Sequence, residues 1–389
     1  MLASFKSNES NRIIDALFIV AQHDRCAWAG EIRACVSLSR AFWVEESFWA
    51  GMTRVWLGPR RRTRLMAAAA AGNVARVRWL VERCGAPVDA CDRWGWTACF
   101  YASSRAKNSQ VIALLLSRGA NVNMRTLGGS NCLIKAASLG CEENTRCLLA
   151  AHAALEVRAN MGKTALHVAS HRGRTGVVCA LLEAGADCHA AAGGSNFGWT
   201  PLIFAAQLGH TACVELLLAA GALVDVSVAG SWQAIHWASS DGLSSHADLL
   251  RLLLRHGAKQ TPADKGETPL YLACKKGFAA DVKVLLEAGA DACSADAQLE
   301  SCIHAAASGD AEIVDIVWRA GADMNAQTAG AWTPLHRAVH ANKLDVVKWL
   351  VAHGALLNIK TLSGRRPLDI AYEMHHDQIV DVLRAAQYR

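Results

Sequence analysis

Two pairs of histidines have the spacing that comes nearest to a metal-binding or catalytic pattern in this chain. His167 and His171 are four residues apart, as are His336 and His340, and two zinc ligands on one face of a helix have this spacing. No glutamate directly follows the first histidine of either pair, and the sequence suggests no third ligand nearby. We therefore expect these histidines to belong to the scaffold, and we expect no catalytic residue, metal or cofactor in this chain.

The glycines and cysteines also do not form a phosphate-binding or metal-binding motif. Gly193-Gly194-Ser195 lacks the Gly-Lys-Ser/Thr that follows in a phosphate-binding loop. The chain has 14 cysteines but no C-x-x-C pair, so we favour reduced, buried thiols that act as small hydrophobes over disulfides or zinc sites. Such thiols are typical of a reducing compartment, and the expected location is the cytoplasm.

An alanine recurs at a nearly fixed period from about residue 60 to the C-terminus. Each copy stands five residues after a register residue, and the register residues, from Thr63 to Arg366, are 32 to 36 residues apart. A period of this size indicates a solenoid of stacked helical units, which usually offers a surface for holding another molecule. The ten alanines are Ala68, Ala102, Ala136, Ala169, Ala205, Ala238, Ala273, Ala306, Ala338 and Ala371.

Each unit predicts a helix, a short turn, a second helix and then a projecting turn. In Thr200-Pro201-Leu202 the hydroxyl can cap a free N–H, and proline suits the first helical position. Where Asn131 or another residue replaces the threonine, we expect a weaker cap or none. The second helix is expected to end at a glycine with a left-handed backbone. His152 takes the place of that glycine in one unit, which predicts an uncommon backbone angle there.

The run Thr333-Pro334-Leu335-His336-Arg337-Ala338, repeated in variant forms, resembles the ankyrin repeat. The resemblance implies an all-α solenoid of about ten helix-turn-helix repeats over residues 60–389, behind a short helical domain of residues 1–59. It implies that the histidine three residues after the register residue ties neighbouring turns together by hydrogen bonds. It also implies that the turns and the first helices, which line a concave groove, bind a protein partner.

Residues 1–59 lack the period and are richer in aromatic side chains. The stretch from Ala34 to Trp49 is similar to the second half of an F-box, although the opening Leu-Pro of that family is missing. This resemblance implies binding to the adaptor of a cullin-type ubiquitin ligase. The alternative is a plain cap on the first repeat. The residues implied in adaptor binding are Leu17, Phe18, Val36, Phe42 and Trp49.

Tryptophans recur in the turns, directly before the register residue. Tryptophan is enriched among residues that dominate binding energy, so we predict a protein-binding role for these side chains, with packing on the next turn as the alternative. Trp79, Trp318 and Trp349 lie in second-helix apolar runs and are expected to pack. The predicted binding residues are Trp94, Trp96, Phe197, Trp199, Trp232 and Trp332.

Charge and hydropathy limit the classes of partner. The net charge is +6 over 389 residues, with Lys and Arg dispersed among Asp and Glu, which does not indicate a nucleic-acid surface. No apolar run reaches the length of about 18 residues that a membrane helix needs. The basic cluster at 60–64 is interpreted as a solvated linker; a nuclear-import patch, which would add a nuclear location, is the alternative.

Together these features predict a non-catalytic adaptor that binds a protein through its repeats. The more specific hypothesis is a substrate-recognition subunit of a cullin-type ubiquitin ligase. The alternative is a pure scaffold or inhibitor without a ligase link. The lengthened turns at 190–198 and 239–246 are either contact loops or tolerated insertions.

Overall fold

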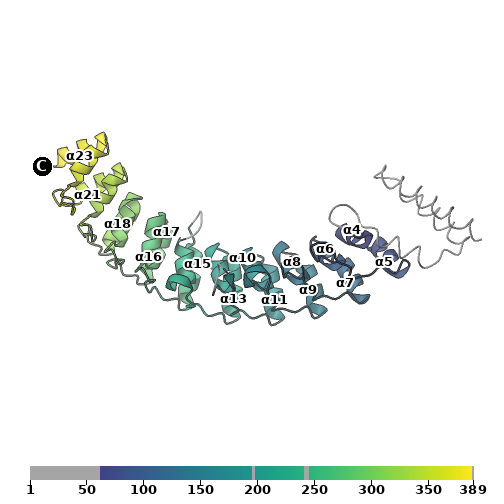
Figure 1. Cartoon of the computed structure of the whole chain (residues 1–389). Coiled ribbons are helices and arrows are strands. Elements are labelled where there is room, and N and C mark those ends of the chain that lie inside the picture. Colours follow the sequence, from purple (N-terminus) through teal and green to yellow (C-terminus); the bar gives the residue numbers. More distant parts are fainter. Residues whose placement is uncertain (1–61, 195–197, 241–244, 388–389) are drawn as a thin grey trace, which may run out of the picture.

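Ten pairs of helices stack side by side into one curved array (Figure 1). The computed structural model describes residues 62–194, 198–240 and 245–387. Successive first helices contact one another, and so do successive second helices. This arrangement confirms the predicted all-α solenoid of about ten helix-turn-helix units.

The first helices are short and the second helices slightly longer. The first helices are α4 (Arg64–Ala70), α6 (Ala98–Ser103), α8 (Cys132–Leu139), α10 (Ala165–His171), α12 (Pro201–Gln207), α14 (Ala234–Ser240), α16 (Pro269–Lys276), α18 (Cys302–Ala307), α20 (Pro334–His340) and α22 (Pro367–Glu373). The second helices are α5 (Val74–Glu82), α7 (Ser109–Ser117), α9 (Glu142–Ala150), α11 (Thr175–Glu183), α13 (Thr211–Ala219), α15 (Ala247–Arg255), α17 (Ala279–Glu287), α19 (Ala311–Arg319), α21 (Leu344–Ala352) and α23 (Asp377–Gln387). Within the described residues, the turns contain the 3-10 segments η1 (Asn160–Gly162) and η3 (Ala229–Ser231).

The predicted domain boundary at residue 59 stays a prediction, because residues 1–61 lie outside the described part of the chain. Among the residues that the structure describes, no helix is long and apolar enough to cross a membrane.

The register residue caps most of the first helices. Thr200 Oγ1 accepts a hydrogen bond from the Ile203 amide, and Pro201 occupies the first helical position. The expected weak cap at Asn131 is wrong, because its carboxamide oxygen accepts a hydrogen bond from the Ile134 amide at 2.9 Å. An asparagine oxygen reaches the third amide of the helix as well as a threonine hydroxyl does.

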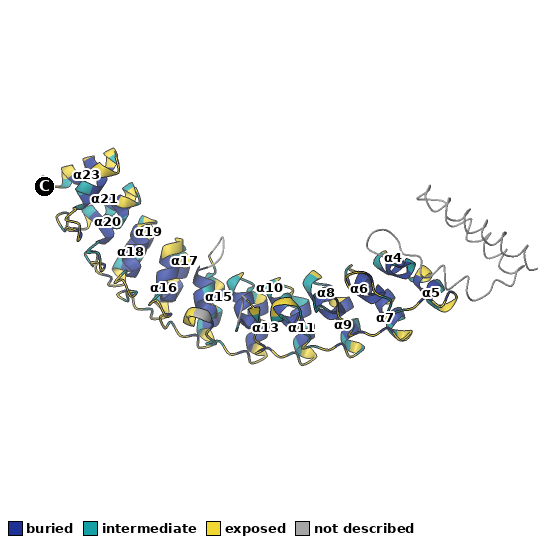
Figure 2. Ribbon diagram, viewed as in Figure 1, coloured by how far each residue is buried: buried dark blue, intermediate teal, exposed yellow. Residues whose placement is uncertain are grey.

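The alanine column forms the contact between neighbouring first helices. All ten of its members are buried, with at most 4% of each residue exposed. Because alanine has no atoms beyond Cβ, the helix axes can approach closely without leaving a void. The buried residues lie on the inner faces of the helices along the whole array, and the exposed ones lie mainly at helix ends and turns (Figure 2). Each repeat therefore completes the core of its neighbour.

A buried histidine ties each of four repeats to the following turn. His167 Nδ1 accepts a hydrogen bond from the Thr164 amide at 3.2 Å, and its Nε2 lies 3.1 Å from the Trp199 carbonyl oxygen. His336 repeats this pattern with the Thr333 amide at 3.1 Å and the Arg365 carbonyl at 3.3 Å. These bonds confirm the scaffold role that the family resemblance implied. His236 and His304 make equivalent bonds.

The bonding partners require a neutral ring. A backbone amide can only donate, so Nδ1 must accept, and Nε2–H then donates to the carbonyl oxygen. Burial agrees with this state, because it lowers the pKa of His167 from its ordinary value to about 4. Burial is also the main cause that lowers the pKa of His236, His304 and His336.

His152 has the left-handed backbone that its position predicted, with φ of 57°. The corresponding Gly119 has φ of 83°, and a Cβ atom at that position would meet only open space. A Cβ atom at such a helix end meets no neighbouring atom. The free-energy cost of a histidine at residue 152 therefore comes from the backbone angle alone. A left-handed non-glycine residue costs about 1 kcal/mol.

We expect His152→Gly to raise the free energy of unfolding by roughly 0.5–1 kcal/mol, since glycine adopts this angle without strain but loses more chain entropy on folding. Gly119→Ala is the matched reverse change and should lower it by a similar amount. Urea unfolding followed by circular dichroism measures both. A free energy of unfolding that changes in the same direction in both variants would contradict the assignment of strain to residue 152.

We expect the stability of the array to fall as the pH drops from about 6.5 toward 4. The folded-state pKa of His167 is depressed, so below about pH 6.5 the unfolded chain binds a proton that the folded chain excludes. At pH 5 this linkage costs roughly 2 kcal/mol for His167 alone. His167→Gln should weaken the fold at pH 7.5 but make the difference between pH 7.5 and pH 5 smaller. Urea midpoints at both pH values test this, and an unchanged difference would exclude a neutral His167.

Candidate protein-binding surface

Backbone hydrogen bonds join most of the neighbouring turns into a strip. The Leu127 amide donates to the Trp94 carbonyl at 2.9 Å, and the Gly193 amide donates to the Met161 carbonyl at 2.8 Å. Near the other end, the Leu362 amide donates to a carbonyl of the preceding turn at 3.1 Å. The turns are therefore held in fixed positions relative to one another, as a binding surface requires.

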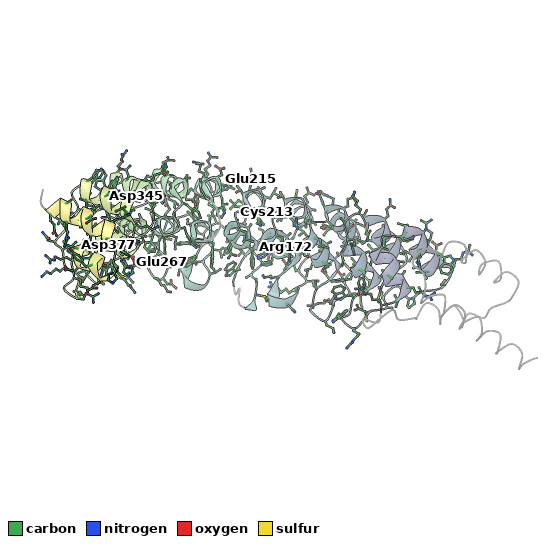
Figure 3. The ribbon with its side chains drawn as sticks, turned by 90° about the horizontal axis from the view of Figure 1, so that it is seen from above. Arg172, Cys213, Glu215, Glu267, Asp345 and Asp377 are labelled. Atoms are coloured by element: carbon green, nitrogen blue, oxygen red, sulfur yellow. The ribbon has the colours of Figure 1, made fainter. Side chains whose placement is uncertain are left out.

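Two columns of side chains line the junction between the turns and the first helices. One column is the residue directly before each register residue, and the other is the residue four positions after it; we call them together the turn–helix row. Seen from above, Glu267 of this row lies toward one long side of the array, whereas Glu215 of α13 lies toward the other (Figure 3). The first column comprises Arg62, Trp96, Ser130, Lys163, Trp199, Trp232, Glu267, Glu300, Trp332 and Arg365.

A hydrogen-bonded group anchors the N-terminal end of the row. Arg62 Nε donates to the Tyr101 hydroxyl at 2.6 Å, which donates to Asp92 at 2.8 Å. The other oxygen of Asp92 accepts from the amides of Trp94 and Trp96. Burial is the main cause that raises the pKa of Tyr101, so its hydroxyl stays protonated as a donor. The first tryptophan turn is thus rigidly held.

Aromatic rings fill the middle of the row. Trp199 is only 7% exposed, and its ring centroid lies 4.5 Å from that of Trp237 and 5.0 Å from that of Phe204. The ring centroid of Trp232 also lies 4.7 Å from that of Trp237. The ammonium group of Lys163 lies 4.5 Å from the Phe204 ring centroid, where burial lowers its pKa. This cluster joins three consecutive repeats.

A cation also covers a ring at the C-terminal end of the row. The guanidinium of Arg337 lies 5.4 Å from the Trp332 ring centroid and pairs with Glu300 at 3.0 Å. His340 meets the same ring edge-on at 5.5 Å. Cation–π contacts therefore recur along the row.

The predicted binding tryptophans differ in exposure. Trp94 is 41% exposed, and Trp96, Trp232 and Trp332 are half-buried. Trp199 is buried, so the packing alternative describes this residue and we do not carry its binding role forward. Phe197 lies outside the described residues, as do all five of the residues implied in adaptor binding, Leu17, Phe18, Val36, Phe42 and Trp49.

The second-helix tryptophans pack, as expected. Trp318 and Trp349 meet edge-on at 5.5 Å, and Trp349 stacks on His353 at 3.9 Å. Trp79 packs against the core. These contacts confirm the packing prediction for this group.

The sequence analysis did not predict several residues of the turn–helix row and of the turns. Trp237, Lys135 and Arg337 occupy the column four residues after the register residue, and the period could have identified them. Exposed apolar residues at turn tips were also missed. They interrupt polar turns and are Leu127, Met161, Leu299 and Leu362.

Cysteines are mostly core residues. All twelve cysteines in the described ranges are free, and eight of them are buried, which fits the small-hydrophobe interpretation. Within the same ranges, no group of three or more His, Cys, Asp and Glu side chains is placed to hold a metal ion.

Sequence comparisons identify the repeats. A family profile described as Ankyrin repeats (3 copies) matches residues 107–192, 133–228, 189–261, 223–296 and 302–388. A second profile, Ankyrin repeats (many copies), matches residues 65–116. Together these matches cover well over half of the chain.

Curated relatives match only in part. An L-asparaginase from Dirofilaria immitis is 35% identical over 32% of this chain and 21% of its own length. The human palmitoyltransferase ZDHHC13 is 34% identical over 39% of this chain and 30% of its own length. Alpha-latroinsectotoxin-Lt1a from Latrodectus tredecimguttatus is 27% identical over 33% of this chain and 7% of its own length. The chain therefore spans less than a third of each of these relatives.

We expect Trp199→Ala to cost about 3–5 kcal/mol of stability, as the loss of a large buried side chain does. Trp94→Ala should cost less than about 0.5 kcal/mol, because an exposed side chain leaves no cavity. Chemical denaturation of the two variants makes the comparison. Similar losses would show that Trp94 serves packing as much as Trp199 does.

Proposed function

The chain belongs to the ankyrin-repeat family, and on this basis we propose that it is a non-catalytic adaptor that binds a protein partner along its turn–helix row. The enzymatic activities in the names of two relatives are not carried over, because the shared segments cover 21% and 30% of those proteins. Function is argued instead from the surface that this chain presents.

The aromatic and cationic side chains that the turn–helix row brings together are the observation that carries the proposal. Half-buried Trp96, Trp232 and Trp332 share the row with cationic side chains such as Lys135, whose ammonium lies 5.7 Å from the Trp96 ring, and with two glutamates between Trp232 and Trp332. Tryptophan and basic groups on one surface supply both apolar contact and directional polar contact to a partner. Such a row suits a protein ligand that spans several repeats.

The rigidity of the row supports tight binding. Turn-to-turn hydrogen bonds and buried histidines hold the turns before any partner arrives. A preorganised surface loses little conformational entropy on association, so more of the contact energy remains as affinity. This argument requires no rearrangement of the repeats on binding.

The finer proposal is that residues 1–59 recruit a cullin-type ubiquitin-ligase adaptor while the repeats select the substrate. It rests on the stretch from Ala34 to Trp49, which is similar to part of an F-box. The second candidate, a scaffold or inhibitor without a ligase link, treats residues 1–59 as a cap. The two candidates share the repeat surface and differ only in the role of the N-terminal segment.

Pull-down from eukaryotic lysate with full-length proteins tests both levels. We expect Trp94→Ser/Trp332→Ser to lose most bound partner, because Trp332 belongs to the row and exposed Trp94 lies two residues before Trp96 of the row. Leu356→Ser is the matched control, since Leu356 is 55% exposed but belongs to neither column of the row and lies four residues after the end of α21. Phe42→Ala/Trp49→Ala should lose only ligase components.

Quantitative mass spectrometry reads the result. Partner retention by the Trp94→Ser/Trp332→Ser variant would argue against binding at the row. If no ligase component binds the wild-type chain, the scaffold candidate replaces the ligase proposal, and the protein-binding proposal is unaffected.

A further inference from the structure

Three consecutive turns near the N-terminal end of the array expose large apolar side chains. Trp94 is 41% exposed, Leu127 is 80% exposed and Met161 is 43% exposed; we call these three residues the N-terminal tip row. Leu127 follows Trp94 across a turn-to-turn hydrogen bond, and the Asn160 amide, next to Met161, donates to the turn of Leu127 at 3.2 Å. Apolar side chains aligned in this way on adjacent turns are typical of an interaction surface.

Basic side chains with unneutralised charge flank the N-terminal tip row. The guanidinium of Arg125 donates to the Arg158 carbonyl oxygen at 2.8 Å, and that of Arg158 donates to the Ala191 carbonyl oxygen at 2.6 Å. These acceptors are neutral, so the bonds position the cations without cancelling their charge. Within the described residues, neither arginine forms an ion pair, nor does Lys163.

The acidic residues of the same turns are already engaged. Asp92 is buried and bonded to Tyr101 and two backbone amides. Asp89 accepts from the Asn121 amide at 3.0 Å, and Glu156 accepts from the Asp187 amide at 3.0 Å. Bonds to neutral amides leave these carboxylates charged, but the three turns carry four basic residues, Arg93, Arg125, Arg158 and Lys163, against three acidic ones, so their net charge is positive.

A turn in the C-terminal half has the opposite character. Leu299 is 57% exposed and stands at an equivalent tip, but residues 290–300 of its turn include Asp291 and Asp296 and no basic residue, and Glu300 pairs with Arg337. An acidic ligand would meet like charge at this turn and opposite charge at the N-terminal tip row. The N-terminal tip row is therefore suited to an acidic, apolar ligand, and the turn of Leu299 serves as a control within the same chain.

The spacing of the turns indicates the backbone form of a ligand. Each of the three turns leads into a first helix, and these helices, α6, α8 and α10, pack against one another in order. Packed helices are about 8–10 Å apart. A polyproline II segment advances about 9 Å every three residues and returns each third side chain to the same face. Such a segment can therefore place one apolar side chain at each turn.

We propose that the N-terminal tip row binds an extended acidic segment of a partner protein with an apolar residue at every third position. Its apolar side chains contact Trp94, Leu127 and Met161, and its carboxylates pair with Arg125, Arg158 and Lys163. This inference rests on the proposed protein-binding function and specifies the partner's chemistry.

Selection from a random 16-residue peptide library displayed on phage, with the full-length chain as the target, tests the inference. We expect enriched peptides to be net acidic with apolar residues three apart. Their affinity should fall about tenfold in Leu127→Ser, which removes one apolar contact, and should fall with added NaCl. Leu299→Ser, the matched exposed leucine with acidic neighbours, should leave the affinity unchanged.

Three outcomes overturn the inference: no enrichment, enrichment of neutral or basic peptides, or equal sensitivity to Leu127→Ser and Leu299→Ser. Acidic peptides that bind both variants as tightly as the wild type also overturn it, because they use another surface. None of these results decides the broader proposal, which depends on whether lysate partners require Trp94 and Trp332.

Discussion

The buried histidine bond is the interaction on which the repeat geometry depends most directly. A neutral imidazole spans the start of one first helix and the turn before the next, as His167 does between Thr164 and Trp199. Because the ring is excluded from water, losing either bond would leave a buried polar group without a partner. In these four repeats the position of the following turn is therefore set by the preceding repeat.

Rigid turns allow surface side chains to take unequal roles at equivalent positions. Trp199 closes into a cluster with Phe204 and Trp237, whereas Trp332 stays half-open beneath the guanidinium of Arg337. Both tryptophans directly precede a register residue. Trp199 meets Phe204 of the helix that follows it and Trp237 of the next repeat, whereas Trp332 is covered by Arg337 of the helix that follows it. The residue four positions after the register residue therefore decides how far each tryptophan is closed in.

Charge varies along the array while the backbone does not. Around Leu127, arginines donate to carbonyl oxygens and keep their net charge; around Leu299, the turn carries Asp296 and Glu300. The apolar tips alone would recognise any hydrophobic segment. The surrounding charge gives each part of the strip a preference for one class of ligand.

The sequence by itself determined the fold, because alanine, glycine and histidine recur in register. The alanines allow close helix packing, the glycines allow a left-handed backbone, and the histidines bond to the next turn. It predicted the left-handed angle at His152 and the packing of Trp318 for the same reason. It could not separate buried Trp199 from exposed Trp94, since exposure depends on side chains about one repeat away, such as Trp237. Only the tertiary structure joined Leu127 to Trp94, because turn-to-turn contact exists only when repeats stack.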